Sequence, residues 1–327
     1  MAAPQAVVDT PSAGVIEAPD TASRAGTPLG HRAAIWTALF VTVLWSSSWV
    51  LIRWGLDDED LPPLTFAGLR YASAAVILVA WLVARRRPEA RSLPRDRRLM
   101  ARLVLLGILL ITAAQGAQFV ALANQPAATT SLVLGFAPLL VAGAAALSLG
   151  EVPTRRQLLG VLLVALGTAL FAAGDLWATP LGMAAALVGL IAVALSSILG
   201  RDVNRSARLS PALVTAVSMS VGATLLLGVG FVVEDMPALT LGAWLLIGWL
   251  AVVNTAFAFT LWNRSLQGLS AVESAAINNT MAIQVALLAW FFLGEWPGLA
   301  GLAGILVAMF GILLVQRRAV VEPVRAT

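Results

Sequence analysis

Between Arg102 and Glu151 the chain runs for 48 residues without one charged side chain. Hydrocarbon offers no water to backbone N–H and C=O groups, so such a run is stable in a membrane only as helix. One spanning helix needs about 20 residues. The run therefore predicts two membrane helices with a turn at residues 124–126, Asn-Gln-Pro, and the fold class is an all-α integral membrane protein.

Composition excludes several kinds of chemistry. The chain is 59% hydrophobic and 12% charged, whereas a soluble domain carries roughly twice that charged share. It has no Cys, and its single His, His31, lies in a polar N-terminal segment. All 21 basic residues are Arg, which excludes the lysine of a P-loop or a Schiff base. We therefore expect no metal and no cofactor.

Charges, prolines and glycines divide the chain into ten apolar segments. Residues 1–32 are expected to form a disordered tail, and residues 317–327 form a short C-terminal one. A signal peptide is not expected, because the first apolar segment begins only near Ala33. The ten expected spans are 33–54, 63–84, 100–123, 127–149, 156–173, 180–201, 211–233, 239–262, 271–293 and 298–316.

Arginines predict the orientation. All but Arg53 and Arg70 lie in the two tails or in alternate connections, and the intervening connections are acidic. By the positive-inside rule, both termini and the arginine-bearing loops face the cytoplasm. The arginines thus serve as orientation signals beside the lipid bilayer, and nucleic acid is not expected as a partner.

The sequence repeats internally. A shift of 144 residues places Leu149-Gly150-Glu151-x-Pro153 on Leu293-Gly294-Glu295-x-Pro297. A shift of 148 places Leu61-x-Pro63 on Leu209-x-Pro211, and a shift of 150 places Ser46-Ser47 on Ser196-Ser197. The chain therefore divides into two five-helix repeats, residues 33–174 and 175–316. Because five is odd, the repeats have opposite orientations, which is the architecture of alternating-access transporters with a substrate site near the midplane.

These motifs resemble the EamA branch of the drug/metabolite transporter superfamily over residues 33–316. The resemblance rests on the two Leu-Gly-Glu-x-Pro segments and on three further motifs: Trp45-Ser46-Ser47-Ser48-Trp49, Leu69-Arg70-Tyr71 and Phe136-Ala137-Pro138-Leu139. Two positions depart from the family pattern, because Ser46 stands where the family usually has Gly, and Ala282 stands at the position that matches Pro138.

The resemblance implies ten helices with cytoplasmic termini in a bacterial inner membrane, and export of amino acids or other small metabolites. A nucleotide-sugar or lipid-linked sugar carrier is the alternative within transport. A membrane-embedded enzyme or sensor is the alternative from another class, although the predicted spans lack a His, a Cys or paired carboxylates. The sequence leaves substrate, ion coupling and oligomeric state open.

Polar side chains inside the spans are the candidates for a substrate cavity, because amides at mid-bilayer must face protein or water. Each also has a structural explanation as a hydrogen bond between helices or to the backbone one turn back. Carboxamides favour a neutral or zwitterionic solute. The candidates are Trp45, Ser47, Gln115, Gln118, Ser131, Asn254, Trp262, Asn278 and Asn279.

Three charged positions have competing explanations. Arg70, about two turns into the second span, is either a gate or carboxylate contact, or bonds to carbonyls. Glu273 is either a proton-coupling carboxylate or part of the capping box Ser270-Ala-Val-Glu273. Glu151 and Glu295 are expected to be structural, beside helix N-termini where the dipole stabilises a carboxylate.

Overall fold

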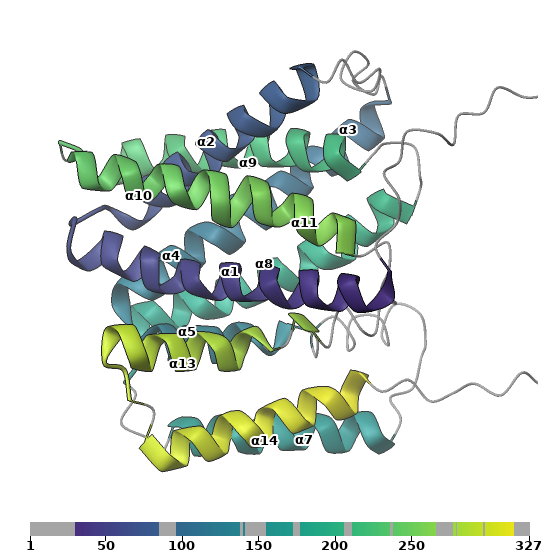
Figure 1. The fold of residues 1–327 in the computed structure, drawn as a ribbon, viewed down its shortest axis with the longest axis vertical. Helices are drawn as coiled ribbons and strands as arrows, with labels where there is room; N and C mark the ends of the chain where they lie inside the picture. Colours follow the sequence, from purple (N-terminus) through teal and green to yellow (C-terminus); the bar gives the residue numbers. More distant parts are fainter. Residues whose placement is uncertain are drawn as a thin grey trace, which may run out of the picture.

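The fold is that of a computed structural model. The described residues are 30–84, 96–137, 140, 155–172, 177–205, 211–235, 238–265, 277–278, 280–296 and 298–316. They are helical and include no strand. The helices lie roughly side by side in one bundle (Figure 1). In chain order they are α1 (His31–Asp57), α2 (Pro63–Ala84), α3 (Arg97–Gly107), η3 (Ile108–Ala113), α4 (Ala114–Asn124), α5 (Ala127–Leu134), α7 (Arg155–Ala172), α8 (Pro180–Arg205), α9 (Pro211–Val233), α10 (Leu241–Ala251), η4 (Val252–Phe257), α11 (Ala258–Ser265), α13 (Met281–Leu293) and α14 (Gly298–Gln316).

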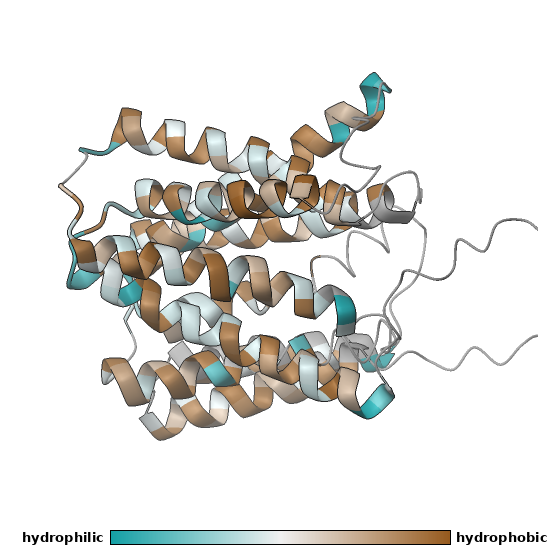
Figure 2. Ribbon diagram, turned by 45° about the horizontal axis from the view of Figure 1, so that its top comes forward, coloured by the Kyte–Doolittle hydropathy of each residue, from teal (hydrophilic) through white to brown (hydrophobic). Residues whose placement is uncertain are grey.

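Six of these helical segments are long and apolar enough to cross a bilayer. Many large apolar side chains are exposed, and brown, hydrophobic residues recur along the length of the helices (Figure 2). Val232 and Phe291, for example, are 87% and 80% exposed. A soluble protein does not display apolar surface on this scale, whereas lipid tails would cover it. The chain is a multi-pass membrane protein; the count of ten spans stays a prediction, although described helices overlap all ten expected segments.

The predicted turn at residues 124–126 is confirmed, because α4 ends at Asn124 and α5 begins at Ala127. The hydroxyl of Thr179, directly before the proline that begins α8, forms a helix cap. It accepts a 2.9 Å hydrogen bond from the N–H of Gly182 and donates to the carbonyl of Asn124 at 3.0 Å. One threonine thus bonds to the last residue of α4 and caps the start of α8.

Two helices contain a π-helical turn. The segment η3 interrupts the helix from Arg97 to Asn124, and η4 interrupts the helix from Leu241 to Ser265. Each is six residues long, and the second begins 144 residues after the first. π-Helical insertions are rare and frequently mark functional sites. Their cause in the sequence is not evident, and nothing in the hydrophobic pattern predicted them.

The core lies between α1, α2, α4, α9 and α10, where Phe66 and Phe119 meet edge to face at 5.2 Å. The pairs of packed helices include α2 with α9, α7 with α14, α4 with α8, and α1 with both α11 and α13. Glycines allow some of these pairs to approach closely. A Cβ on Gly222 of α9 would lie 2.3 Å from the carbonyl oxygen of Gly107 in α3.

The two ends of the bundle differ in charge. We call the end where α1, α3 and α7 begin the basic end, because Arg32, Arg97 and Arg155 lie there (Figure 1). We call the opposite end the acidic end; it carries Asp57, Glu59, Glu234 and Glu295.

Candidate functional site

The serine–tryptophan segment of α1 lies in the middle of the helix and faces α11. The ring centroid of Trp45 is 5.3 Å from that of Phe259 and 5.2 Å from that of Trp262. Trp45 and Trp262 are half-buried, whereas Trp49 is buried in the main core. The sequence candidates Trp45 and Trp262 therefore come together in one aromatic group, but Trp49 is a packing residue.

Asn254 of η4 connects this segment to the second half of the chain. Its Nδ2 donates to the carbonyl oxygen of Leu44 at 2.5 Å and to Oγ of Ser47 at 3.2 Å. Since only the nitrogen can donate, these bonds fix the orientation of the amide. Oδ1 of Asn254 is buried and has no hydrogen-bond partner in the part of the chain that the structure describes.

Gln284 of α13 makes a second connection to α1. Its Oε1 accepts a 3.0 Å bond from Ser46, and its Nε2 donates to Thr42 at 3.1 Å and to Thr280 at 3.0 Å. The serine that replaces the family's usual glycine at position 46 thus holds α13 against α1. Gln284 is bonded at both ends of its amide, as a structural polar contact inside a membrane requires.

A third polar group joins α2, α4 and η4. Arg70 is buried, and its Nε donates to Oγ1 of Thr255 at 3.2 Å. The Thr255 hydroxyl itself donates to the carbonyl of Leu250, five residues back, which is the π-helical spacing. Next to Arg70, the phenol of Tyr71 donates to Oε1 of Gln115 at 2.6 Å. We call Arg70, Tyr71, Gln115 and Thr255 the arginine cluster.

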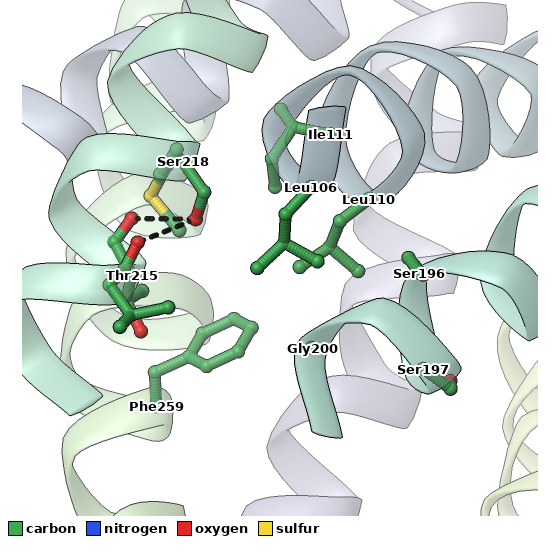
Figure 3. Close-up of a pocket in the computed structure, with 11 residues that line it drawn as sticks. Leu106, Leu110, Ile111, Ser196, Ser197, Gly200, Thr215, Ser218 and Phe259 are labelled. Carbon is green, nitrogen blue, oxygen red and sulfur yellow. Dashed lines mark hydrogen bonds between the residues drawn. The ribbon is translucent and has the colours of Figure 1, made fainter. Parts of the chain in front are cut away.

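A pocket of about 210 Å³ lies in the half of the bundle nearer the basic end. Figure 3 shows Leu106 and Leu110 pointing towards Phe259, with Ser196 and Gly200 on the opposite wall. Its lining is mostly apolar, and the hydroxyls of Ser196, Ser197 and Ser218 bond back to their own helices: Ser218, for instance, donates to the carbonyl of Val214 at 2.8 Å. The pocket also includes Ile111, Ser197, Val214, Thr215 and Met219.

Two walls of the pocket continue into the arginine cluster. Ile111 lines the pocket and Gln115 follows it four residues later; Phe259 lines the pocket and Thr255 precedes it by four. Four residues advance an α-helix by about 6 Å. The pocket and the arginine cluster are therefore consecutive layers of one region inside the bundle.

The remaining candidates do not line the pocket, or they lie outside the described residues. Gln118 is buried, the hydroxyl of Ser131 donates to the carbonyl of Ala128 at 2.9 Å, and Asn278 is exposed. Asn279 and Glu273 lie outside the described residues. Tyr71, Thr255 and Phe259 were missed as site residues. Tyr71 had a signal, since it is the only tyrosine of the chain and stands beside Arg70.

Carboxylates hold helices together at the acidic end. Glu295 accepts from the N–H groups of Ala127 at 3.2 Å and Ala128 at 3.3 Å, in the first turn of α5. Gly294, with φ of 69°, ends α13 in the left-handed conformation and turns Glu295 towards α5. The helix N-terminus that Glu295 caps is thus that of α5 in the other half of the chain. Glu151 lies outside the described residues.

Glu234 makes the same kind of contact on another helix. Its oxygens accept from the N–H groups of Leu64 at 2.9 Å and Thr65 at 2.7 Å, in the first turn of α2. Arg53 adds a further tie, because its guanidinium donates to the carbonyl oxygens of Leu122 and Gln125 and contacts Asp57 at 2.7 Å. Helices from both halves are therefore hydrogen-bonded together at this end.

Burial raises the pKa of the Glu295 carboxyl above its ordinary value of 4.5. The two amide bonds and the positive charge of Arg53 oppose that shift, and the charge of Asp57 adds to it. Desolvation disfavours the charged form of a carboxyl, and it is the largest of these effects.

Apolar helices, polar contacts buried between them and a pocket inside the bundle define a membrane protein that binds small solutes. The profile of the EamA-like transporter family matches the chain twice, over residues 32–173 and 180–317. The chain belongs to this family, whose members are transporters and not enzymes.

The chain is 27% identical to a probable terminal-alkyne amino-acid exporter of Streptantibioticus cattleyicolor, over 87% of this chain and 94% of the relative. It is also 27% identical to the S-adenosylmethionine/S-adenosylhomocysteine transporter of Chlamydia muridarum, over 84% of this chain and 89% of the relative. One crystal structure of another protein superimposes with a TM-score of 0.60 at 18% identity, over 86% of this chain and 96% of that chain. At that identity the likeness concerns the fold alone.

Proposed function

We propose that this transporter is a secondary exporter of amino acids or similar small amphiphilic metabolites, and that it works by alternating access. Two inverted repeats of five helices, residues 33–174 and 175–316, rock about a central cavity. Both termini and the basic end face the cytoplasm of a bacterial cell, in its inner membrane. Transport follows from the substrate gradient or from ion exchange.

The observation that carries the proposal is the equivalence of the two halves. The π-helical segments η3 and η4 occupy matching positions 144 residues apart. Helix contacts also occur in matching sets: α4 packs on α8 as α11 packs on α1, and α8 packs on α5 as α1 packs on α13. When two halves are related in this way, each can adopt the conformation of the other. The protein then has two states of similar energy that open to opposite sides of the membrane, which supports alternating access.

The acidic and basic ends differ in how tightly their helices are bonded, and this difference supports assigning the structure to one state of the transport cycle. The acidic end is tied by Glu295, Glu234 and Arg53, and the pocket lies nearer the basic end. We therefore assign this conformation to the state that loads substrate from the cytoplasm. Opening of the acidic end requires that the ties between α13 and α5 and between α9 and α2 be broken.

The chemistry of the cavity favours an amphiphilic solute. The Trp45, Phe259 and Trp262 rings and the pocket offer apolar surface, and the side chains of Ser47, Gln115 and Asn254 offer hydrogen bonds. We keep Gln118, Ser131, Asn278 and Asn279 as candidates of the same cavity. Both curated relatives are named for solutes that contain an amino-acid unit. A nucleotide-sugar carrier would favour a cluster of basic residues within the spans, where Arg70 stands as an isolated basic residue.

Counterflow in proteoliposomes that contain only this protein tests the proposal. Vesicles loaded with unlabelled amino acids should accumulate the labelled solute without ATP or a partner protein. The absence of counterflow with amino acids, amines and S-adenosyl compounds would contradict the function.

Because the chain has no cysteine, single-cysteine variants report on alternating access without other thiols. Thr215→Cys lies in the pocket and Glu59→Cys lies at the acidic end. A transported substrate should change their labelling by a membrane-impermeant maleimide in opposite directions. Labelling of Glu151→Cys and Glu295→Cys from the same side of the membrane would contradict the inverted repeats.

A further inference from the structure

Arg70 is an unusual residue inside a membrane bundle. It is 4% exposed, and its one hydrogen bond within the described part of the chain comes from Nε. The terminal guanidinium nitrogens make no hydrogen bond or ion pair with those residues. Cζ lies 5.1 Å from the centroid of the Tyr71 ring, a cation–π contact that stabilises the charge but supplies no anion. A buried arginine in a spanning helix is costly and normally pairs with an anion or with carbonyl groups.

The residue before Thr255 carries a second buried polar atom with no partner among the described residues. This atom is Oδ1 of Asn254, and Asn254 is 1% exposed. The next residue, Thr255, is the one that holds Arg70. A buried polar atom left unpaired also costs free energy. Two adjacent residues of η4 are thus linked to missing contacts. Thr255 contacts Arg70, which lacks an anion, and Oδ1 of Asn254 lacks a hydrogen-bond donor.

The internal repeat shows which residues stand at the equivalent positions of the other half. The shift of 144 residues places Asn254 on Leu110 and Thr255 on Ile111, and the shift of 148 places Arg70 on Ser218. Leu110, Ile111 and Ser218 all line the apolar pocket. Equivalent places in the two halves therefore hold a charged, polar site in one half and an apolar pocket in the other.

From these contacts we infer that Arg70 and Asn254 form the subsite for the backbone of a zwitterionic α-amino acid. The guanidinium of Arg70 binds the carboxylate, Oδ1 of Asn254 accepts from the ammonium group, and the apolar side chain extends towards the pocket. This inference rests on the proposed transport function, and it specifies which atoms recognise the solute. Thr255 acts as a positioning residue, because its bond to the Leu250 carbonyl keeps its hydroxyl directed at Arg70.

Three probes with the same six-carbon chain test the two contacts on the purified full-length protein. L-norleucine has both charged groups, L-norleucinamide lacks the carboxylate, and hexanoate lacks the ammonium group. The measurement is the rise of the melting temperature with probe concentration, which follows binding to the folded state. We expect norleucine to bind best and the amide to bind at least about tenfold more weakly, because a lost charged contact costs more than one factor of ten.

Two variants separate ligand recognition from a structural role. Arg70→Met removes an unpaired buried charge, so without ligand it should melt about 2–4 °C higher than the wild type while losing the response to norleucine and hexanoate. Arg53→Met is the matched control, since Arg53 bonds two carbonyl oxygens and Asp57. It should melt lower and keep the response to norleucine.

Asn254→Leu introduces the residue found at the equivalent position of the other half, Leu110, and tests the contact with the ammonium group. It should bind norleucine and hexanoate with equal affinity. The inference is overturned if Arg70→Met melts lower, as Arg53→Met should, or binds norleucine within about threefold of the wild type. Equal binding of acid and amide by the wild type, or no response to norleucine at all, also overturns it. Binding through Arg70 without counterflow would instead reject the transport function and leave the subsite in place.

Discussion

Oε1 of Gln115 accepts a 2.6 Å hydrogen bond from the phenol of Tyr71, and this bond joins α4 to α2 next to the buried Arg70. The glutamine is half-buried, and its amide nitrogen makes no hydrogen bond with the described residues. Gln115 is thus both a contact between helices and a polar group one turn beyond the pocket. The two roles make different predictions for its replacement.

Gln115→Ala should lower the rate of counterflow about tenfold and leave the melting temperature within about 2 °C of the wild type. One hydrogen bond between membrane helices contributes about 0.6 kcal/mol on average, and water can replace the amide at a half-buried position. The measurements are initial rates in proteoliposomes and melting in detergent. Failure of the variant to fold would show that Gln115 mainly holds the helices together.

Local sequence determined much of the fold that could be predicted. The turn before Ala127 and the cap at Thr179 follow from the identity of a few neighbouring residues, and both are present. The contact between Arg70 and Thr255 joins residues 185 apart in the chain and depends on the π-helical turn, which leaves no periodic signal. The pocket was not predictable either, because it depends on how side chains from four helices fill the space between them.

The Leu-Gly-Glu motif illustrates the same limit. The sequence indicated that Glu295 stabilises a helix N-terminus, and the glycine before it allows the chain to turn. The helix that receives the carboxylate is α5, which begins 168 residues earlier than Glu295. Spacing along the chain identifies the type of contact but not its partner.

Gly222→Ala should destabilise the protein by about 1–3 kcal/mol, because overpacking forces backbone movement. The added methyl group would lie 2.3 Å from the carbonyl oxygen of Gly107 and 2.6 Å from Cβ of Ile111. Gly228→Ala on the same helix is the matched control, since a Cβ there has no atom within 4 Å. The control should be neutral or more stable by up to about 1 kcal/mol. Equal stability of the two variants would mean that α3 and α9 do not pack this closely.

Gly200→Leu should fill the pocket without disturbing the bundle. A Cβ at Gly200 meets only one side-chain atom, Cδ1 of Leu106, at 3.6 Å. The longer side chain would then occupy the space between α8 and α3 (Figure 3). We expect the apparent KM for apolar amino acids to rise at least about tenfold, because the chain of the solute loses its apolar contacts, while that for glycine or alanine changes little. An equal rise for large and small solutes would show that the pocket does not hold their side chains.

Glu295→Gln should remove part of the pH dependence of stability. The pKa of Glu295 is raised by burial above 4.5, so the folded protein binds this proton more tightly than the unfolded chain does. The resulting stabilisation is present in full below pH 4.5, and it is lost as the pH rises through the higher pKa of the folded state. Melting temperatures measured upward from pH 4.5 should therefore fall more steeply for the wild type than for the variant. Glu234→Gln is the matched control for the loss of a carboxylate cap, because Glu234 caps α2 as Glu295 caps α5. Parallel curves for Glu295→Gln and the wild type would contradict the assignment of this proton to Glu295.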